Sequence, residues 1–413
     1  MFARFKNLIF TETGKDTSIV FAGTAVNIIV GGLFFIIIPR ILGPQSYGIL
    51  STVIVTGLFA ANTANFAIDS GLLKFAKKGE PNFDRYLTLA IKSYLLFGAI
   101  TSLIGVAMAP HIARFLKIEN HQNLLQIAFI SVILLLLTNF YVASLQAKKE
   151  FLKASCVNIV SNIARIFLVV MGILFYELDL TGVAVIFFFI PITSIITGHF
   201  FLKFHFENNT KEEFIKFHKF NFWIALAFII ASVPLDTYFL IKIAGPVAVG
   251  IYAAPYKLLT AIHQLSGNFS RVLATRYSTF DTSEKVIIFS KKAAVYVILF
   301  SAVSLLSMLV APTLINNFLG INYQSSIIIF RILTGGFIFF FASTIPLSII
   351  LYYFGQSQVT FNITLMRVLV TTALLLILVQ KYQAAGAAFA FLITEAVIFF
   401  GTSAYCAYKL KKI

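Results

Sequence analysis

The sequence predicts an all-α polytopic membrane protein, with about twelve transmembrane helices in two six-helix bundles around a central cavity. Three observations carry this prediction: an apolar composition, long uninterrupted apolar runs, and a weak internal repeat. Hydrophobic residues make up 59% of the 413 positions and charged residues 12%, and the mean hydropathy is +0.92. Soluble domains carry about 25% charged residues. The composition therefore excludes a soluble enzyme and a disordered chain.

Twelve apolar runs have about the length that crosses a bilayer, which is roughly 20 residues in a helix. They are separated by clusters of Pro, Gly and charge. The runs are continuous and lack the alternation of barrel strands, so helices are expected. The predicted spans cover residues 17–39, 47–68, 86–110, 122–144, 155–176, 182–202, 221–241, 247–270, 293–311, 325–354, 358–379 and 384–408.

The distribution of basic residues predicts how these spans are oriented. The formal net charge of +16 would suggest a nucleic-acid partner in a soluble chain. In a membrane protein, Lys and Arg instead collect in cytoplasmic loops. If both termini are cytoplasmic, 22 of the 32 basic residues fall inside, five outside and five within spans. We therefore expect cytoplasmic termini and no nucleic-acid partner.

A weak repeat predicts two halves of the same orientation, residues 1–207 and 208–413. The segment Arg40–Pro44 resembles Lys242–Pro246, 202 positions later. Arg165 and Arg367 have the same offset, and Gly182 and Gly386, which open the sixth and twelfth spans, differ by 204. The offset covers an even number of spans, so the repeat is parallel. Residues 203–221 are expected to link the halves.

The eighth span carries the most informative polar stripe. Its members are spaced by 7, 4 and 3 residues, so they fall within about 60° on one helix face; they are Lys257, Gln264, Asn268 and Arg271. Such a stripe predicts one wall of a hydrated cavity. The alternative is a lysine that reaches toward the interface and a Gln/Asn pair that joins helices.

Asp236 lies two residues after Pro234, and Lys257 lies two residues after Pro255. A proline within a span frees a backbone carbonyl and permits a bend. Asp236 is therefore either part of a moving gate or the static partner of Lys257.

Other charged or amide residues also lie within spans. Asn62, Asn65 and Asp69 share a face of the second span, although Asp69 would be merely solvated if it lies at the cytoplasmic boundary. Arg165 and Arg367 are either salt-bridge partners between helices or ligand contacts. Arg331 and Glu395 are candidates for a pair. Basic residues outnumber acidic ones inside the spans, which favours an anionic cargo.

Motifs of soluble catalysis are missing from the sequence. It contains no glycine-rich phosphate loop and no metal-ligand spacing. We therefore expect a protein that is not an enzyme and has no cofactor or metal. Transport would be driven by an ion gradient, the membrane potential or the gradient of the cargo.

Short motifs resemble a known family. Ile38–Pro44 followed by Tyr47-Gly48, and Leu145-Gln146-Ala147 followed by Lys148-Lys149 and Phe151, are similar to polysaccharide-biosynthesis membrane proteins. These are the Wzx-type oligosaccharide flippases of the MATE-like MOP exporter superfamily. The resemblance covers essentially the whole chain.

The resemblance implies a flippase in a bacterial or archaeal cell membrane (the inner membrane where there are two). It would move a polyprenyl-phosphate-linked oligosaccharide from the inner to the outer leaflet by alternating access, for O-antigen, lipopolysaccharide or other surface polysaccharide biosynthesis. In relatives the first, second, seventh and eighth spans line the cavity. Lys257 and Arg271 would then meet phosphate or acidic sugar, and Gln264, Asn268, Asn62 and Asn65 would bond hydroxyls. Gating or coupling to Na+ or H+ would fall to Asp236, Asp69, Arg40, Arg165 and Arg367, with membrane lipids as further partners.

The main alternative is a MATE-type exporter that couples drug or metabolite efflux to a cation. Such a protein would bind organic cations through acidic residues, and the basic stripe with Lys257 argues against it. A membrane glycosyltransferase or polymerase would need a large external loop, and no predicted external loop exceeds about 15 residues. A non-transporting assembly subunit is a further alternative, which the repeat and the polar stripes disfavour.

Overall fold

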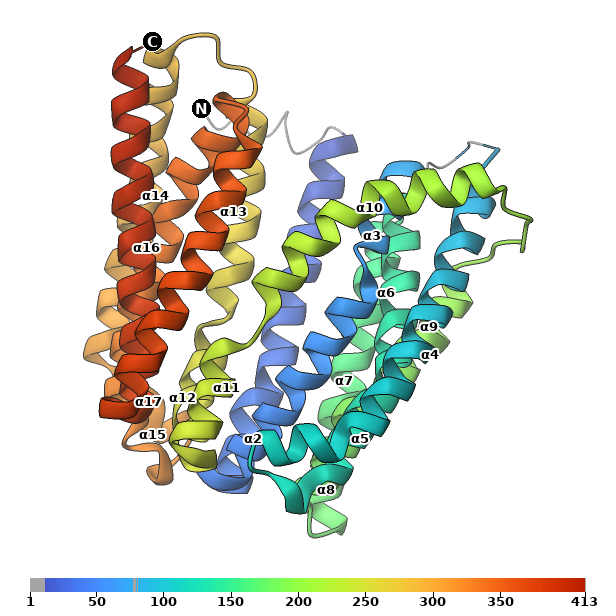
Figure 1. Cartoon of the computed structure of the whole chain (residues 1–413), viewed down its shortest axis with the longest axis vertical. Helices are drawn as coiled ribbons and strands as arrows, with labels where there is room; N and C mark the ends of the chain where they lie inside the picture. Colours follow the sequence, from blue (N-terminus) through green and yellow to red (C-terminus); the bar gives the residue numbers. More distant parts are fainter. Residues whose placement is uncertain (1–11, 77–78, 80, 413) are drawn as a thin grey trace. The chain divides into compact units, whose positions relative to one another are not determined.

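A computed structural model describes residues 12–76, 79 and 81–412, with only the backbone given for residues 12–22, 24, 261, 263, 264, 268, 271 and 275. The described residues form helices and connecting loops, with no strand among them (Figure 1). In chain order the elements are α2 (Glu12–Asn65), α3 (Ile68–Phe75), α4 (Phe83–Phe115), η1 (Glu119–His121), α5 (Gln122–Ile130), α6 (Val132–Ala147), α7 (Phe151–Phe175), α8 (Leu180–Phe189), α9 (Pro191–Phe201), α10 (Lys211–Ser232), α11 (Leu235–Ile243), α12 (Gly245–Leu259), α13 (Ala261–Tyr277), α14 (Ser283–Leu309), α15 (Ala311–Phe318), η2 (Ile321–Tyr323), α16 (Ser326–Ser348), the π-helical η3 (Ile349–Tyr353) and α17 (Ser357–Lys412).

Nine helical stretches of the described chain are long and apolar enough to cross a membrane. Two of them contain a sharp break. Gly43 has φ 71° and ψ 172° inside α2, and Gln383 has φ 49° and ψ −124° inside α17. Each break divides one stretch into two membrane-length helices, and α12 with α13 forms a further one. The predicted all-helical, multi-pass architecture of about twelve spans is confirmed.

Residue contacts group the chain into two compact units. The first unit runs to Phe34 and resumes over Val53–Pro234. The second unit takes Phe35–Thr52 from α2 together with Leu235–Ile413. The division into residues 1–207 and 208–413 was based on the sequence repeat, whereas these units are based on residue contacts. The two lobes therefore stay a prediction.

The repeat has a structural counterpart in the second unit. Gly43 and Gly245 both have positive φ, 71° and 82°, and each precedes a proline that starts a helix. A Cβ added to Gly48 would collide with the carbonyl oxygen of Pro246, and one added to Gly250 with that of Pro44. Gly48 and Pro44 correspond to Gly250 and Pro246, 202 positions later, and each glycine faces the proline of the other segment. The two repeated segments therefore cross in a symmetrical way.

The predicted linker is shorter than expected. Residues 203–221 were predicted to be a polar connection, but α10 already begins at Lys211. Thr210 accepts a hydrogen bond from the backbone of Glu213, and the Glu213 carboxylate accepts one from the backbone of Thr210. This capping box starts a helix within the charged segment. Phe217 then packs on Phe75 and Tyr86, which anchors the first turns of α10 in the first unit.

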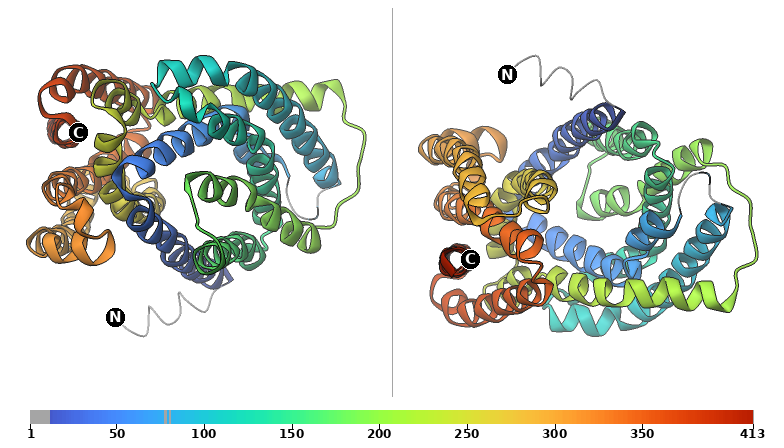
Figure 2. Two further views of the ribbon diagram at one scale, coloured as in Figure 1. Left: turned by 90° about the horizontal axis from the view of Figure 1, so that it is seen from below. Right: turned by 90° about the horizontal axis from the view of Figure 1, so that it is seen from above.

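Packing in the second unit centres on α16. This helix packs against α14, α12, α13 and most extensively α17, and Figure 2 views this group nearly along its axes. Large apolar side chains on α14, such as Leu306 and Leu309, remain 62% and 74% exposed, as does Leu103 on α4 of the first unit at 73%. Side chains of this kind on a helix exterior are suited to contact lipid.

Candidate functional site

The first unit contains a pocket of about 460 Å³ whose polar lining is mainly amide side chains, here called the amide pocket; apolar side chains line the rest. Four of its residues carry carboxamides and two others carry a carboxylate and a hydroxyl. They come from α2, α3, α6 and α10, and are Asn62, Asn65, Asn139, Gln146, Asp69 and Ser232. Asn62, Asn65 and Asp69, which were predicted to share one face of the second span, therefore line the same pocket.

A break in the second span positions two of these side chains. Phe66 and Ala67 have φ of 47° and 52°, a left-handed conformation that costs roughly 1–2 kcal/mol per residue without glycine. The predicted span ran to residue 68 without interruption, but α2 ends at Asn65 and a separate α3 begins at Ile68. Strained backbone of this kind often occurs at functional sites. Here it redirects the chain so that Asn65 and Asp69 line the same pocket.

Hydrogen bonds fix the orientation of the pocket residues. The Tyr94 hydroxyl donates to Asn65 Oδ1 at 2.9 Å, and the backbone N–H of Ser70 donates to Asp69 Oδ1 at 2.9 Å. Carboxamides both donate and accept hydrogen bonds, and so do sugar hydroxyls. The pocket can therefore bind a neutral polyol, and Asp69 adds one negative charge.

Asn139 and Gln146 are pocket residues that the sequence analysis did not assign to a site. They are seven residues apart on α6, so they share a helix face. That spacing was available in the sequence. The pairing of α6 with α3, which brings the two faces together, was not.

In the second unit, Lys257 and Asp236 are close enough to interact electrostatically. No Lys257 nitrogen lies within 4 Å of a carboxylate in the described part of the chain, so the predicted static Asp236–Lys257 ion pair is not formed. The Lys257 ammonium lies 5.2 Å from the centre of the Phe35 ring. Asp236 instead accepts a hydrogen bond from the backbone N–H of Thr237 at 2.7 Å, and it lies close to the Tyr252 side chain.

Three predicted ligands cannot be placed in detail. Gln264, Asn268 and Arg271 belong to α13, but their side chains lie outside the described part of the structure. The break between α12 and α13 falls at Thr260, three residues after Lys257. The stripe thus runs across two helices, and its role in binding stays a prediction.

The remaining predicted arginines have different surroundings. Arg40 is exposed and donates to the backbone carbonyl of Asn317 at 3.2 Å. Arg165 packs beside the adjacent rings of Phe34 and Phe187. Arg367 donates from Nη2 to Glu395 Oε2 at 3.1 Å. None of these contacts tests gating or coupling.

The suggested pairing of Arg331 with Glu395 is wrong. Arg331 donates from Nε to the carbonyl of Met308 at 3.0 Å, and Glu395 is occupied by Arg367. Arg367 and Glu395 stand on the two sides of the Gln383 break in α17. Their pairing depends on how the chain folds back at that residue, which the sequence pattern did not specify.

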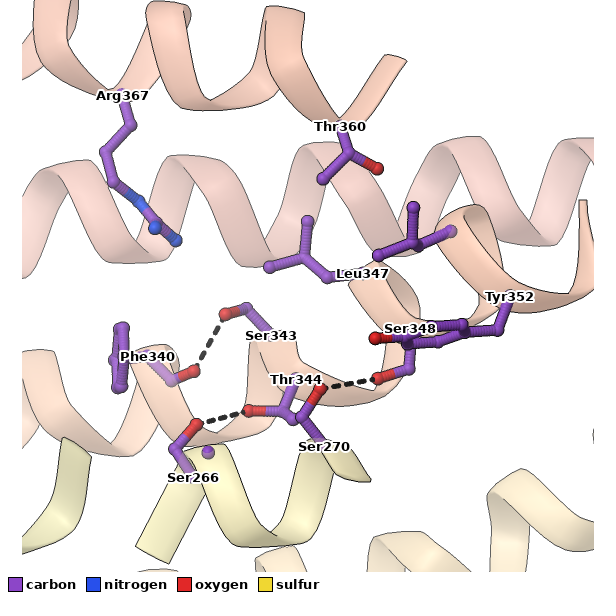
Figure 3. Close-up of a pocket in the computed structure, with 12 residues that line it drawn as sticks. Ser266, Ser270, Phe340, Ser343, Thr344, Leu347, Ser348, Tyr352, Thr360 and Arg367 are labelled. Atoms are coloured by element: carbon purple, nitrogen blue, oxygen red, sulfur yellow. Dashed lines mark hydrogen bonds between the residues drawn. The ribbon is translucent and has the colours of Figure 1, made fainter. Parts of the chain in front are cut away.

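A second pocket, about 320 Å³ in the second unit, is lined by hydroxyl side chains and is here called the hydroxyl pocket. Ser266 and Thr344 are hydrogen-bonded at 2.8 Å, and Ser270 and Ser348 lie 3.5 Å apart. Arg367 and Thr360 face these residues from α17 (Figure 3). The sequence analysis did not identify this pocket, because single Ser and Thr residues in apolar helices commonly bond their own backbone.

Among the described residues no three His, Cys, Asp or Glu side chains come together as metal ligands. The polar groups are amides, hydroxyls and isolated charges. This arrangement can bind and orient a polar or anionic molecule.

The structure is similar to solved transporters over nearly its full length. It matches a lipid II flippase, MurJ, in an inward closed conformation with a TM-score of 0.75 and 15% identity, covering 96% of this chain and 87% of that chain. A MATE family multidrug transporter of the MOP superfamily in its inward-facing conformation gives 0.74 and 13%, covering 94% and 95%. An outward-facing MATE transporter gives 0.64 and 14%, covering 98% and 97%. At these identities the likeness shows the fold alone, which is the MOP transporter fold.

The search of curated proteins finds no match to the sequence. Residues 13–274, well over half of the chain, match the family described as polysaccharide biosynthesis protein. With its apolar helices, its transporter fold and this match, the chain is a multi-pass membrane protein that belongs to the polysaccharide biosynthesis protein family.

Proposed function

We propose that the protein is a Wzx-type flippase that moves a polyprenyl-phosphate-linked oligosaccharide from the inner to the outer leaflet by alternating access. Its cargo would serve O-antigen or another surface polysaccharide, in a cell membrane with both termini of the chain cytoplasmic. The observation that carries the proposal is the amide pocket, in a chain of the polysaccharide biosynthesis family. Four carboxamides suit the hydroxyl groups of a sugar better than an apolar drug.

Charge supports the same cargo. Lys257 has no ion-pair partner within 4 Å in the described chain, and the five basic residues in spans exceed the acidic ones. An ammonium with no carboxylate in direct contact can meet the phosphate of a lipid carrier. In this account Lys257 and Arg271 bind phosphate or acidic sugar, and Gln264 and Asn268 bond further hydroxyls. Asp236 or Asp69 would couple Na+ or H+, and Arg40 would act at the gate.

The test is complementation of a strain that lacks this gene and has lost its surface polysaccharide. The double change Asn62→Ala with Asn139→Ala should reduce surface polysaccharide at least tenfold at equal membrane level, because both walls of the amide pocket lose hydrogen-bonding groups. The matched control is Asn208→Ala with Asn322→Ala, two exposed amides in connections, which should leave export unchanged. Normal export by the pocket variant would contradict the proposal.

A MATE-type cation-coupled exporter is the second candidate, and the likeness to MATE transporters together with Asp69 in the amide pocket favours it. Asp69→Asn separates the two candidates. A drug exporter would lose resistance to organic cations when the carboxylate is removed, whereas a flippase would show no such resistance before or after the change.

A further inference from the structure

Arg165 lies deep in α7, far from both ends of the helix. It is 14 residues after Phe151 and 10 before Phe175, or about 21 Å and about 15 Å at 1.5 Å per residue. An arginine side chain cannot reach the membrane interface over such distances. The guanidinium therefore has to be accommodated within the apolar part of the first unit.

The side chain also points inward from α7. At 100° per residue, Arg165 shares a face with Ser161, Val169 and Gly172, which are buried. The opposite face carries Ile163, Phe167 and Val170, which are 53%, 57% and 38% exposed. The arginine thus faces the interior of the unit and not the lipid.

Aromatic rings take the place of a counter-ion. The guanidinium carbon lies 5.5 Å from the centre of the Phe34 ring and 4.8 Å from that of Phe187. Nε is buried and makes no hydrogen bond, and no carboxylate of the described residues lies within 4 Å of Arg165. Two cation–π contacts stabilise the charge. They leave the in-plane N–H donors unused, although a charge in this environment normally has a partner.

The acidic residues at the start of α2 lie far from this level along the helix. Near this level α2 and α7 run parallel, because Asn27 accepts from Asn162 at 3.2 Å and Phe34 contacts Arg165. Glu12 and Asp16, whose side chains are not described, lie at least 18 positions before Phe34 on α2. That separation is about 27 Å along the helix.

The repeat supplies an internal comparison. Arg367 is the equivalent of Arg165, 202 residues later, and it pairs with the buried Glu395. When Gly182 is aligned with Gly386, the position of Glu395 corresponds to Pro191 in the first half. One half therefore carries an internal acid for its arginine and the other carries a proline.

We infer that Arg165 is an anion-binding residue of the first unit and that it binds phosphate oxygens of the lipid-linked cargo. This inference rests on the proposed function and extends it to a residue and a substrate group. The planar guanidinium packs beside two adjacent rings, whose centres are 5.5 Å apart, and its N–H edge offers the bidentate geometry that phosphate accepts.

The experiment measures binding of farnesyl diphosphate to the full chain in lipid nanodiscs, with farnesol as the uncharged probe. Arg165→Gln should weaken farnesyl diphosphate binding at least tenfold and leave farnesol binding unchanged. Arg165→Lys should have a farnesyl diphosphate affinity between those of the parent and Arg165→Gln, since it keeps the positive charge but loses the bidentate guanidinium. The control is Arg114→Gln, the same change at an exposed arginine, which should bind both probes as the parent does.

Equal farnesyl diphosphate affinity for the parent and Arg165→Gln would overturn the inference. If Arg165→Gln does not fold, Arg165→Lys decides: an affinity equal to that of the parent overturns the inference, and a several-fold loss supports it. Competition by phosphatidylglycerol at equal concentration would assign the site to membrane lipid and overturn its assignment to the cargo. Binding is measured without transport, so failed transport with Arg165-dependent binding would remove the proposed function and leave the site standing.

Discussion

At the scale of single residues, Gly48 and Gly250 are where two backbones approach most closely. Each faces a proline carbonyl oxygen, which cannot turn away as a flexible side chain can. Gly48→Ala and Gly250→Ala should each destabilise the protein by about 1–3 kcal/mol, the usual cost of overpacking. The measurement is the thermal midpoint of detergent-solubilised protein, followed by size-exclusion chromatography.

Gly401→Ala is the matched control, because no atom lies within 4 Å of a Cβ added there. Its thermal midpoint should stay within about a degree of the parent, since an exposed helical glycine gains only the roughly 1 kcal/mol of alanine helix propensity at most. An equal loss in Gly48→Ala and Gly401→Ala would show that the crossing is not tightly packed.

The pair of Arg367 and Glu395 gives a second prediction at this scale. Arg367→Gln leaves a carboxylate that is 3% exposed without its partner, and removing one member of a buried pair costs about 3–5 kcal/mol. The Arg367 side chain is 27% exposed, so the low end of that range is expected. Adding Glu395→Gln should recover most of the loss, as a double-mutant cycle of thermal unfolding would show. Additive effects of the two changes would mean that the pair does not form in the membrane.

Sequence reasoning was effective for some site residues and not for others. Asn62, Asn65 and Asp69 do line one pocket, although the break at Phe66-Ala67 puts Asp69 on a different helix from the other two. The partners Asn139 and Gln146, and the pairing of Glu395 with Arg367, depend on which helices pack together. Contacts of that kind are tertiary, and a periodicity within one segment does not encode them.

At the scale of elements, the start of α10 depends on its cap. Thr210 and Glu213 exchange side-chain to backbone hydrogen bonds of 3.2 and 2.9 Å. Thr210→Ala should cost about 1 kcal/mol of local stability, seen as several-fold faster amide hydrogen exchange over residues 211–214. Thr313→Ala, an exposed threonine at the second position after the start of α15, is the control and should leave that exchange unchanged. Unchanged exchange in Thr210→Ala would show that the capping box is dispensable.

The elements also show which breaks a sequence reveals. The Gly43-Pro44 and Gly245-Pro246 junctions were evident, since glycine and proline mark helix ends. The break at Gln383 was also expected, since the predicted spans end at residue 379 and resume at residue 384, whereas Phe66-Ala67 carries no such signal. At Phe66-Ala67 the backbone adopts a conformation that the local sequence does not favour, so hydropathy alone extended the second span too far.

At the scale of the whole molecule, the charge count predicts the orientation of every connection. Asn208 precedes α10 and Asn322 lies between α15 and α16, and both are exposed. In a background without Cys156 and Cys406, a membrane-impermeant thiol reagent should label Asn322→Cys in intact cells. It should label Asn208→Cys only after permeabilisation. The reverse labelling pattern would show that the orientation in the membrane is opposite to the predicted one. Equal labelling of both cysteines would contradict the predicted number of spans between positions 208 and 322.

The fold was predictable at this scale because a bilayer admits few architectures. A chain of apolar runs must form helices whose backbone groups are satisfied internally, and an even repeat offset fixes parallel halves. The cargo is specified less directly, since lipid II flippases and drug exporters match this fold almost equally well. It has to be argued from the amide pocket and the unneutralised basic residues.

The most direct test of the account is reconstituted transport. The purified protein would be placed in vesicles containing a fluorescent, short-chain polyprenyl-diphosphate-linked oligosaccharide, with accessibility of the sugar to an external lectin measured over time. The account predicts that the protein moves this lipid between leaflets and that Asn62→Ala with Asn139→Ala slows the movement at least tenfold. Protein-containing vesicles that flip it no faster than empty ones, while carrying an organic cation across the bilayer, would contradict the account.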